Sequence, residues 1–380
     1  MAGHAAPVVP PAAWVEVTAS PVALTEAPRD GLERALLARC GTGEAGLAAA
    51  ARDVVSRKLQ RLPMPQPDAI ALAQRSAGEP HPWARAWAAS AKGLPPDATL
   101  RELDAWLADD RTPRLRRCAV ASGEAPDGTR AIAVVAVDAL ADLAPLPTRG
   151  RTGQWLTVEA TLRVKAEGGT VVILEPGGAP RRVSAWFDGT TLRARFVLDR
   201  PGDFAVQVVA STSEGPRPVI EASVFADVEP PALMPAGEVA FAQPSPPIDA
   251  RDEALLTETL ASGLASARAT AGEPPLQRDA RLDAVARAHA LRMAADRELA
   301  HDAGDGDPDE RLRAAGLTAQ ASGENVAHAA TVTLAHAALW ASPSHRANML
   351  RRDFDRVGVA VVRDDRGDVW AVETFASGLQ

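Results

Sequence analysis

The sequence predicts an α+β protein of several domains, and three patterns along its 380 residues support this prediction. Leucines recur at helical spacing near both ends of the chain, which indicates amphipathic helices in two separate regions. Short apolar runs separated by turn residues fill the middle, which indicates strands. A length prior of roughly 150 residues per domain gives two or three domains, each long enough to bury its own core.

The composition excludes some classes of partner. The formal net charge is −8 and there is no run of like positive charge, so we expect no binding to nucleic acid or to an anionic membrane surface. No window approaches the length of apolar run that a membrane span needs, and we therefore expect no transmembrane segment. The opening residues, Met-Ala-Gly-His-Ala-Ala-Pro, lack the basic and apolar regions of a secretory signal. We expect either a cytosolic protein or one from which a signal peptide has been removed.

The N-terminal third predicts an extended segment followed by a mixed domain. Residues 1–23 are rich in proline and alanine, which favours an extended lead-in. In residues 24–145, apolar side chains recur at helical spacing in three segments that glycine and proline clusters separate: Leu32, Leu36 and Leu37; Val54, Val55 and Leu59; and Leu100, Leu103, Trp106 and Leu107. Two strand-like runs, 118–121 and 131–137, then flank Asp127-Gly128, which is a hairpin turn signal.

The two cysteines of the chain, Cys40 and Cys118, both lie in this domain. They could form a disulfide in an oxidising compartment, but two thiols do not make a disulfide framework. Two buried free cysteines explain the sequence about equally well. The sequence therefore leaves their redox state open.

Residues 146–228 predict a β-sandwich. Six strand-like runs are separated by turn residues: 155–164, 170–174, 183–187, 191–198, 204–210 and 219–226. Several short strands with frequent turns are typical of such sandwiches. The region resembles the immunoglobulin-like modules that are common in bacterial envelope proteins, although it has no cysteine pair and no ligand motif. A proline-rich linker is predicted at residues 229–250, where the chain should be extended and rather stiff.

The last region, residues 251–380, contains five of the seven histidines. Apolar residues at helical spacing predict two helices: Leu256, Leu260 and Leu264 on the first, and Leu282, Val285 and Met293 on the second. His289 shares the apolar stripe of the second helix, which favours a packed structural role. His301 follows in a loop, where a side chain can project into a cleft. Next, Asp307-Pro308-Asp309-Glu310 has the form of a helix N-cap, a first-turn proline and a capping glutamate.

Three residues of this region form the candidate site: His301, Glu324 and His345. Two imidazoles and a carboxylate that a fold brings together can hold a divalent metal or work as general acid and base. No other part of the sequence contains a group of residues that points as strongly to a catalytic or metal-binding site.

The local structure around these residues can also be predicted. Gly323-Glu324-Asn325 is expected to form a tight turn before a helix over residues 326–340, which would carry two solvated or half-buried histidines. Farther on, Ser342 is expected to cap a short helix that begins at Pro343. A nucleophilic serine is not favoured, because no Gly-x-Ser-x-Gly elbow is present.

The same region resembles the CAP superfamily in its bacterial form. That superfamily includes cysteine-rich secretory proteins, antigen 5 and plant pathogenesis-related protein 1. The resemblance covers about residues 251–380 and rests on motifs in the family's order: Arg268-Ala-Thr-Ala-Gly272, Pro275-Leu276, Leu282 to Met293, His301, Glu310-Arg311, Ala315-Gly316, Ser322-Gly-Glu-Asn325, Trp340, Ser342-Pro-Ser-His-Arg-Ala-Asn-Met-Leu350 and Val357-Gly-Val-Ala360. It implies a three-layer α-β-α sandwich in an exported bacterial protein.

The resemblance also implies a binding cleft. His301, Glu324 and His345 match the two histidines and the Gly-Glu-Asn glutamate of the family's conserved cleft. Such a cleft can hold a divalent metal, with zinc as the first choice, and ligands proposed for the family include lipids, peptides and cell-wall glycans. The family's second glutamate would fall at Pro343, so one carboxylate is missing. Glu373, on the predicted final strand, could supply another carboxylate, but it is expected to face outward.

A weaker likeness links the two ends of the chain. Trp106-Leu107 followed by residues 118–121 resembles Trp340-Ala341 followed by residues 357–360. Residues 24–145 are therefore either a degenerate CAP-like unit or an unrelated α+β domain. Because this region has one histidine, His81, and no Gly-Glu-Asn, we expect no active cleft in it.

The leading functional hypothesis is an exported bacterial CAP-domain protein that acts as an envelope or extracellular binding module, in the periplasm or outside the cell. One alternative is a metal-assisted hydrolase, in which Glu324 is the general base and His301 and His345 hold the metal. Another is a non-catalytic structural or partner-binding protein. Two histidines and one carboxylate leave an open metal position in a catalytic or a regulatory site, so the sequence does not decide.

Overall fold

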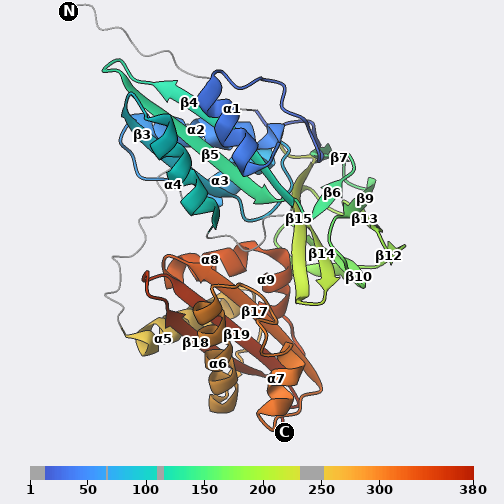
Figure 1. Ribbon diagram of the computed structural model, residues 1–380. Helices are drawn as coiled ribbons and strands as arrows, with labels where there is room; N and C mark the ends of the chain where they lie inside the picture. Colours follow the sequence, from blue (N-terminus) through green and yellow to red (C-terminus); the bar gives the residue numbers. More distant parts are fainter. Residues whose placement is uncertain (1–12, 66, 109–114, 232–251) are drawn as a thin grey trace, which may run out of the picture. The chain divides into compact units, whose positions relative to one another are not determined.

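The computed structural model describes residues 13–65, 67–108, 115–231 and 252–380 (Figure 1). The contacts within the chain divide it into two compact units that share the central strands: residues 1–164, 190–204 and 219–242 form the first, and residues 165–189, 205–218 and 243–380 form the second. Most of the predicted lead-in and of the predicted proline-rich linker, residues 1–12 and 232–250, lies outside the described residues. Among the helices that are described, none is long and apolar enough to cross a membrane.

The N-terminal domain is a four-stranded sheet between two layers of helices. Its elements in chain order are α1 (Gly31–Cys40), β2 (Thr42–Gly43), η1 (Ala45–Leu47), α2 (Ala48–Leu59), α3 (Pro67–Ser76), β3 (Arg85–Lys92), α4 (Pro96–Ala108), β4 (Arg116–Glu124) and β5 (Thr129–Asp138). The strand order is β2-β4-β5-β3, with β2 parallel to β4 and the other pairs antiparallel. Side chains of α2 and α3 pack on one face of the sheet, and those of α1 and α4 pack on the other.

The three helices and the hairpin predicted for this domain are confirmed. The sequence patterns did not predict α3 or β3. β3 contains four alanines and no β-branched residue, so it lacks the composition of a strand. It is held in the sheet by pairing with β5, from Arg85 opposite Ala136 to Lys92 opposite Thr129.

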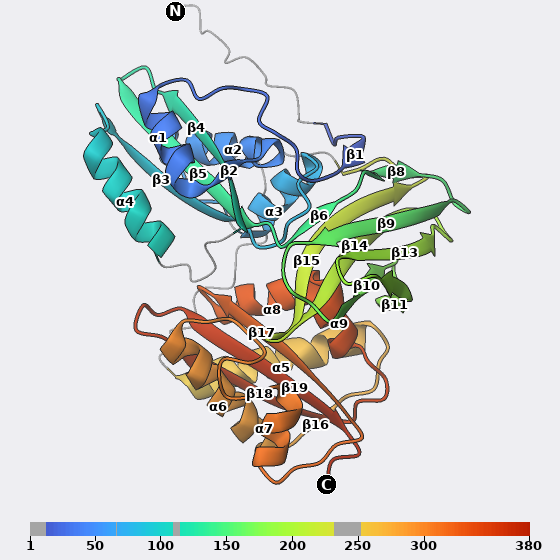
Figure 2. The same ribbon diagram turned by 45° about the vertical axis from the view of Figure 1, so that its right-hand side comes forward.

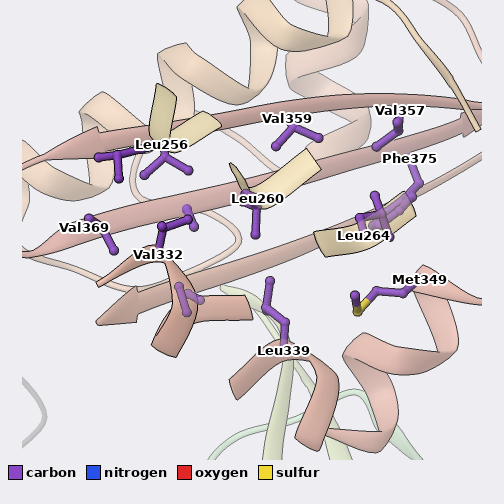
Figure 3. Packing of buried hydrophobic residues seen from close by; sticks show 14 of the residues in the cluster. Leu256, Leu260, Leu264, Val332, Leu339, Met349, Val357, Val359, Val369 and Phe375 are labelled. Atoms are coloured by element: carbon purple, nitrogen blue, oxygen red, sulfur yellow. The ribbon is translucent and has the colours of Figure 1, made fainter. Parts of the chain in front are cut away.

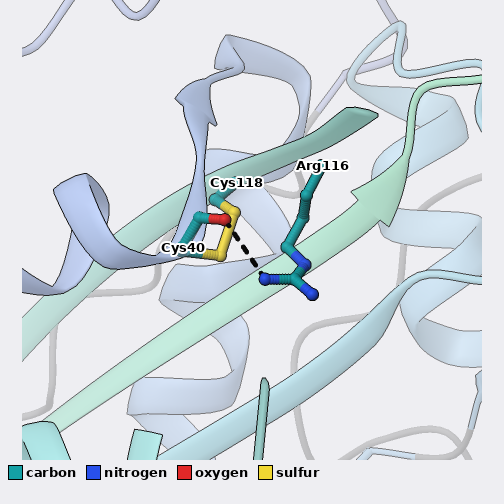
Figure 4. The surroundings of a disulfide bond; sticks show 3 residues. All are labelled: Cys40, Arg116 and Cys118. Atoms are coloured by element: carbon teal, nitrogen blue, oxygen red, sulfur yellow. Dashed lines mark hydrogen bonds between the residues drawn. A yellow bond between two sulfur atoms is a disulfide. The ribbon is translucent and has the colours of Figure 1, made fainter. Parts of the chain in front are cut away.

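Cys40 and Cys118 form a disulfide (Figure 4). It joins the last residue of α1 to β4, with 6.2 Å between the Cα atoms and 78 residues between the cysteines along the chain. Both cysteines are buried. Arg116 lies beside the bridge and donates from Nη1 to the carbonyl oxygen of Cys40 over 3.5 Å. Of the two alternatives that the sequence left open, the structure therefore contains the bridge.

The central region is β-rich, as the sequence predicts. Its main strands are β6 (Ala141–Leu143), β8 (Arg149–Gly150), β9 (Trp155–Leu162), β10 (Gly168–Leu174), β11 (Arg181–Val183), β12 (Ala185–Phe187), β13 (Thr191–Val197), β14 (Gly202–Thr212) and β15 (Gly215–Ala226). They form two sheets, of order β11-β10-β14-β15-β8 and β12-β13-β9-β6. Alternate residues of β9 and β13 are buried, so each of these strands turns one face to a core.

The strands of this region begin earlier than the predicted limit at residue 146. β6 pairs with β9 and so belongs to the same sheet, although the prediction placed it in the preceding domain. β1 (Val17–Thr18), within the predicted lead-in, pairs with β7 (Leu146–Pro147). Sheet pairing of such short strands depends on partners far away in the sequence, which a local pattern does not contain.

The C-terminal domain is also a sheet between two layers of helices (Figures 1 and 2). Its elements are α5 (Glu253–Thr270), β16 (Gln277–Arg278), α6 (Ala280–Asp296), α7 (Pro308–Ala314), β17 (Ala321–Ala329), α8 (Val332–Ala341), α9 (Pro343–Met349), β18 (Arg356–Arg363) and β19 (Val369–Ser377). The strand order is β16-β18-β19-β17. Residues of α5, α8 and α9, among them Leu260, Leu339 and Met349, pack on one face (Figure 3), and α6 and α7 cover the other.

The predicted helix over residues 326–340 is wrong in its first part. Residues 321–329 form β17, which pairs with β19 along its whole length, and α8 begins only at Val332. Thr331 marks the true start, because its hydroxyl accepts the N–H of Leu334 over 3.2 Å. Apolar content alone does not separate a buried strand from a helix, which explains the error. His328 therefore lies exposed on a strand, and His336 lies half-buried on the helix.

The two helix-covered sheets have the same order of elements. Each runs through a helix, a short strand, two helices, a strand, a helix and an antiparallel hairpin. The N-terminal domain adds the short 3-10 helix η1 before α2, and the C-terminal domain adds α9 before its hairpin. Numbered along the chain, the strands of both sheets lie in the order first, third, fourth, second. Equivalent helices also share a face, since α1 and α4 pack together as α5 and α8 do.

Candidate functional site

The site is built at the side of the C-terminal sheet that α6 and α7 cover. Glu324 lies on β17, His301 lies in the loop after α6, and Arg311 lies on α7. A capping box fixes the start of α7, as predicted: Asp307 accepts the N–H of Glu310 over 2.7 Å, and Glu310 accepts the N–H of Asp307 over 3.0 Å. This start places Arg311 one turn into the helix, within reach of Glu324.

The carboxylate of Glu324 is held from two sides. Its Oε1 lies 2.8 Å from Nδ1 of His301, and its Oε2 accepts a hydrogen bond from Nη2 of Arg311. A second imidazole is also near, because Nε2 of His289 lies 3.8 Å from Oε1. The Glu324 side chain is only 1% exposed, so these groups replace the water that an exposed carboxylate would bind.

Arg311 also fixes the loop that carries His301. Its Nη1 donates to the carbonyl oxygen of His301 over 2.7 Å and to that of Gly306. The same nitrogen lies 3.5 Å from Oδ1 of Asp305. One arginine therefore ties the loop to the sheet, and the position of the His301 ring depends on it.

His289 is fully buried on α6, as expected of a packed structural histidine. Its Nδ1 lies 2.9 Å from Oδ2 of Asp305, and its Nε2 lies 3.0 Å from the carbonyl oxygen of Ala300. The ring therefore braces both ends of the loop that contains His301. It contacts the loop on the side away from solvent, with its Nε2 3.8 Å from Oε1 of Glu324.

The surroundings of Glu324 determine its ionisation. Burial alone would raise the pKa of the Glu324 carboxyl, but the hydrogen bond from His301 and the charges of His301, His289 and Arg311 lower it below its ordinary value. Glu324 is therefore an anchored carboxylate at neutral pH.

His345 lies half-buried on α9. Burial, and then the positive charge of His301, lower the pKa of His345 to about 3. Its imidazole is neutral at neutral pH, which is the form that accepts hydrogen bonds and binds metals. Among the residues that the structure describes, its Nδ1 has no hydrogen-bond partner.

The structure brings the three predicted site residues together only in part. His301 and Glu324 are in contact, and His345 is near enough for the charge of His301 to lower its pKa. Within the described ranges, however, these three residues do not bring one ligand atom each within 4.8 Å of one another. Arg311 also occupies one oxygen of Glu324. In this arrangement the three donor atoms are too far apart to share one ion, and a zinc site at these residues stays a prediction.

Glu373 does not face outward, contrary to the prediction, and is fully buried. It lies opposite Asn325 in the β17–β19 pair, on the face of the sheet away from Glu324. Its Oε2 accepts the Nδ2–H of Asn325 over 2.9 Å, and the same amide nitrogen donates to the carbonyl oxygen of His345 over 3.1 Å. The prediction failed because helices cover both faces of β19. Asn325 and Glu373 instead anchor the helix that carries His345.

Ser342 does not cap α9 as predicted. It occupies the N-cap position, but its side chain makes no capping hydrogen bond. Its hydroxyl accepts instead from Nε2 of Gln207 on β14 over 3.0 Å, and Oε1 of Gln207 accepts the N–H of Ser344 over 2.9 Å. The side-chain amide of Gln207 thus provides the hydrogen-bond acceptor for a backbone N–H at the start of α9. Ser342 is 5% exposed, which also argues against a nucleophilic role.

Three residues of the network, Arg311, Asp305 and His289, are not marked as site residues by any sequence pattern. Arg311 is part of a matched motif, and its position one turn after the Asp307 cap could have pointed to the loop before it. A buried arginine cannot be recognised from composition, however, because its burial depends on the carboxylates that pair with it. Asp305 is one of several aspartates in the loop after α6, and no sequence pattern distinguishes it from the others.

A comparison with known families identifies the C-terminal domain. Residues 263–375 match the family model named CAP, the cysteine-rich secretory protein family. These residues are a CAP domain. The CAP resemblance predicted for the C-terminal region is thereby confirmed. A comparison with curated protein sequences gives no significant match.

Solved structures similar to this chain include three from bacteria. An outer surface protein from Borrelia burgdorferi is 21% identical, with 33% of this chain and 95% of that chain covered and a TM-score of 0.31. An extracellular protein containing an SCP domain from Bacillus anthracis is 14% identical, with 63% and 86% covered and a TM-score of 0.31. A cysteine-rich secretory protein from Staphylococcus aureus is 15% identical, with 63% and 81% covered and a TM-score of 0.29.

Strand register identifies the equivalent positions in the N-terminal sheet. Arg117 on β4 and Arg356 on β18 each lie opposite the first residue of the short parallel strand, so the two can be aligned. This alignment also matches residues 118–121 with 357–360, the pair that the sequence analysis compared. In place of three polar residues of the CAP domain, Glu324, Asn325 and Glu373, the N-terminal sheet has Ala86, Trp87 and Val134.

Proposed function

We propose that this chain is an exported bacterial protein that acts as a binding module at the cell envelope or outside the cell, with its ligand in the cleft of the CAP domain. The observation that carries the proposal is the Glu324 carboxylate, which His301 and Arg311 hold in a buried network. Such a network presents fixed polar groups to a ligand. Of the three predicted site residues, His301, 12% exposed at its side chain, and the half-buried His345 are more accessible than Glu324, which is 1% exposed.

The chemistry of these groups favours a polar ligand. Imidazole rings accept or donate one hydrogen bond at each nitrogen, and guanidinium groups donate several, so the cleft suits hydroxyl, amide and carboxylate groups. A cell-wall glycan or a peptide offers such groups along its whole length. A lipid chain offers none, and the charged network provides no apolar surface for it.

Two observations support export. The Cys40–Cys118 disulfide is typical of proteins that fold in an oxidising compartment, because cytosolic thiols are kept reduced. The match to the cysteine-rich secretory protein family points the same way. Both favour the periplasm or the cell exterior.

The state of Glu324 argues against the hydrolase alternative. A general base works best when its pKa lies near the working pH, and the surroundings of Glu324 lower its pKa below the ordinary value. Both oxygens of this carboxylate already accept a hydrogen bond, which lowers its affinity for a proton from water. Binding without turnover fits the geometry better.

The N-terminal domain fits the role of a degenerate, non-binding copy of the CAP fold. The two domains have the same strand order, and apolar residues stand at the positions of Glu324, Asn325 and Glu373. Its histidine, His81, is fully buried and bonds through Nε2 to the carbonyl oxygen of Ala141 over 2.7 Å. We expect this copy to act as a spacer or as a surface for a partner.

A binding screen with matched variants tests this proposal. The full chain is titrated with muropeptides, short peptides and phospholipid vesicles by isothermal calorimetry. A muropeptide or peptide should bind to the wild type and to His336→Ala, but at least about tenfold more weakly to His345→Ala, since a lost hydrogen bond to a buried ligand costs about 1.4 kcal/mol or more. His345→Ala should fold, because its Nδ1 gives up no internal hydrogen bond.

Two results would contradict the proposal. Binding of vesicles alone would show that the cleft, or another surface, recognises lipid. Hydrolysis of a muropeptide or peptide that is lost in Glu324→Gln and kept in His336→Ala would make the protein an enzyme.

A further inference from the structure

A second group of metal-ligating side chains lies outside the cleft, at the far end of the same sheet. His328 is near the end of β17, and Asp364 and Asp368 flank the turn between β18 and β19. In the part of the chain that the structure describes, these three side chains bring one ligand atom each within 4.8 Å of one another. We propose that His328, Asp364 and Asp368 form a binding site for a divalent cation, with zinc as the best match.

The distances suit a shared ion. Nε2 of His328 lies 3.9 Å from Oδ2 of Asp364 and 3.7 Å from Oδ2 of Asp368. Two ligands at zinc-bond distance in tetrahedral geometry are about 3.4 Å apart. The two distances from the imidazole therefore need to shorten by only a few tenths of an ångström, and the ligand atoms of the two carboxylates lie within 4.8 Å of each other. One nitrogen and two carboxylate oxygens leave a fourth position for water or for a ligand group.

The first carboxylate is held in place by its own turn. Oδ1 of Asp364 accepts the N–H of Arg366 over 3.0 Å and that of Asp368 over 2.9 Å. Its Oδ2, which faces His328, accepts the Nε1–H of Trp370 over 3.2 Å. The Asp364 side chain is only 6% exposed, so this ligand is ordered before any ion binds.

The imidazole is oriented by an aromatic neighbour. The ring of His328 stacks on Trp370, with 4.2 Å between centroids and 25° between planes. Trp370 thus contacts the histidine with its face and the Asp364 carboxylate with its indole N–H. Hydrogen bonds from neighbouring groups to the ligands are common in protein metal sites, and the indole N–H of Trp370 supplies one to Asp364.

The ionisation of the ligands also suits a cation. Burial lowers the pKa of His328 below its ordinary value, although Asp368 and Asp364 oppose this change, so the ring is neutral at neutral pH. The pKa of Asp364 is lowered as well: burial would raise it, but hydrogen bonds from Trp370 and from two backbone N–H groups outweigh that effect. A neutral imidazole and an ionised carboxylate are the forms that bind zinc.

This site is separate from the cleft. His328 lies four residues beyond Glu324 on β17, roughly 13 Å away at about 3.3 Å per residue. An ion there would tie the β18–β19 turn to the neighbouring strand. The proposal does not rest on the function proposed for the cleft.

Calorimetry on the full chain, stripped of metal with EDTA and titrated with zinc chloride at pH 7.5, tests the proposal. The wild type should bind one zinc ion at this site. His328→Ala and Asp368→Asn should each lose measurable binding, whereas His301→Ala/His345→Ala, which removes the cleft imidazoles, should retain it. His328 is partly exposed and its ring contact is with Trp370 alone among the aromatic pairs of the described residues, so its replacement should leave the domain folded in EDTA.

Three outcomes would overturn the proposal. They are no zinc binding by the wild type, zinc binding that survives both His328→Ala and Asp368→Asn, and binding of calcium in preference to zinc. Binding that is lost in His301→Ala/His345→Ala and kept in His328→Ala would place the metal in the cleft instead.

Discussion

Asn325 donates from its Nδ2 to Oε2 of Glu373 over 2.9 Å, while the other oxygen of this carboxyl group, Oε1, has no partner among the described residues. Glu373 is fully buried at this position. Burial raises the pKa of Glu373 to about 7, although the hydrogen bond from Asn325 opposes the change. The domain therefore contains a carboxyl group that is partly protonated at neutral pH.

This pairing predicts how stability depends on pH. Because the folded pKa of Glu373 lies above the unfolded value, its contribution to stability is complete below pH 4.5 and is lost as the pH rises through about 7. Glu373→Gln keeps the bond from Asn325 and cannot ionise. The variant should be more stable than the wild type at pH 8, by up to about 3 kcal/mol, with little difference at pH 4.5.

Urea denaturation at both pH values, with hydrogen exchange to follow residues 252–380, measures this difference. Glu258→Gln is a suitable control, since its carboxylate is 65% exposed and pairs with Arg278 on the surface. A gain at pH 8 that also appears in the control, or a gain at pH 4.5 of the same size, would contradict the assignment.

Much of the C-terminal fold could be predicted because its signals are local. The leucine spacing of α5, the stripe of α6 and the capping box at Asp307 each lie within a few turns of chain. The contact between His301 and Glu324 was predicted from the family resemblance. The family's motifs indicate which residues far apart in the sequence lie close together in the fold, and residue spacing alone does not.

The errors concern residues whose environment is set from far away. Gly323, Glu324 and Asn325 were assigned to a turn before a helix, but pairing with β19, nearly fifty residues later, makes them a strand. Glu373 was expected to face solvent, but alternation tells only that neighbours point to opposite faces, and here helices cover both. Arg311 is buried only because Glu324 and the loop carbonyls surround it.

Gly358 on β18 packs directly against the start of α6. A Cβ added at this glycine would lie 2.1 Å from the carbonyl carbon of Leu282, which is backbone and cannot move aside alone. Gly358→Ala should therefore destabilise the C-terminal domain by about 1–3 kcal/mol or more, through overpacking. Thermal unfolding compares it with Gly168→Ala, where the added Cβ meets nothing within 4 Å. Equal melting temperatures for the two variants would contradict the close contact.

The disulfide should stabilise the N-terminal domain. It closes a loop of 78 residues between α1 and β4, and removing a native bridge costs about 2–5 kcal/mol. Cys40→Ser/Cys118→Ser should lower the melting temperature of this domain and leave that of the CAP domain unchanged. Dithiothreitol should destabilise the wild type in the same way and have no effect on the double variant. A reductant effect on the double variant would show that the bridge is not its cause.

Arg311 should matter more than an exposed arginine on the same helix. Arg311→Met removes the partner of Oε2 of Glu324 and leaves a carboxylate that is 1% exposed without its counter-charge. Breaking a buried pair in this way costs about 3–5 kcal/mol, because the remaining charge stays desolvated. Arg313→Met, two residues on and exposed, should cost less than about 0.5 kcal/mol.

A double-mutant cycle isolates the pair. The stability lost in Arg311→Met is expected to come from the Glu324 carboxylate, which stays buried without its arginine partner. Arg311→Met/Glu324→Gln should then recover part of this stability at pH 7, because burying a neutral amide costs less free energy than burying an unpaired charge. Arg311→Met should also be less harmful near pH 3, where Glu324 can take up a proton. Additive costs for the two single substitutions at pH 7 would mean that Arg311 acts through its bonds to the loop carbonyls of His301 and Gly306, and the role of Glu324 as its anchor would be lost.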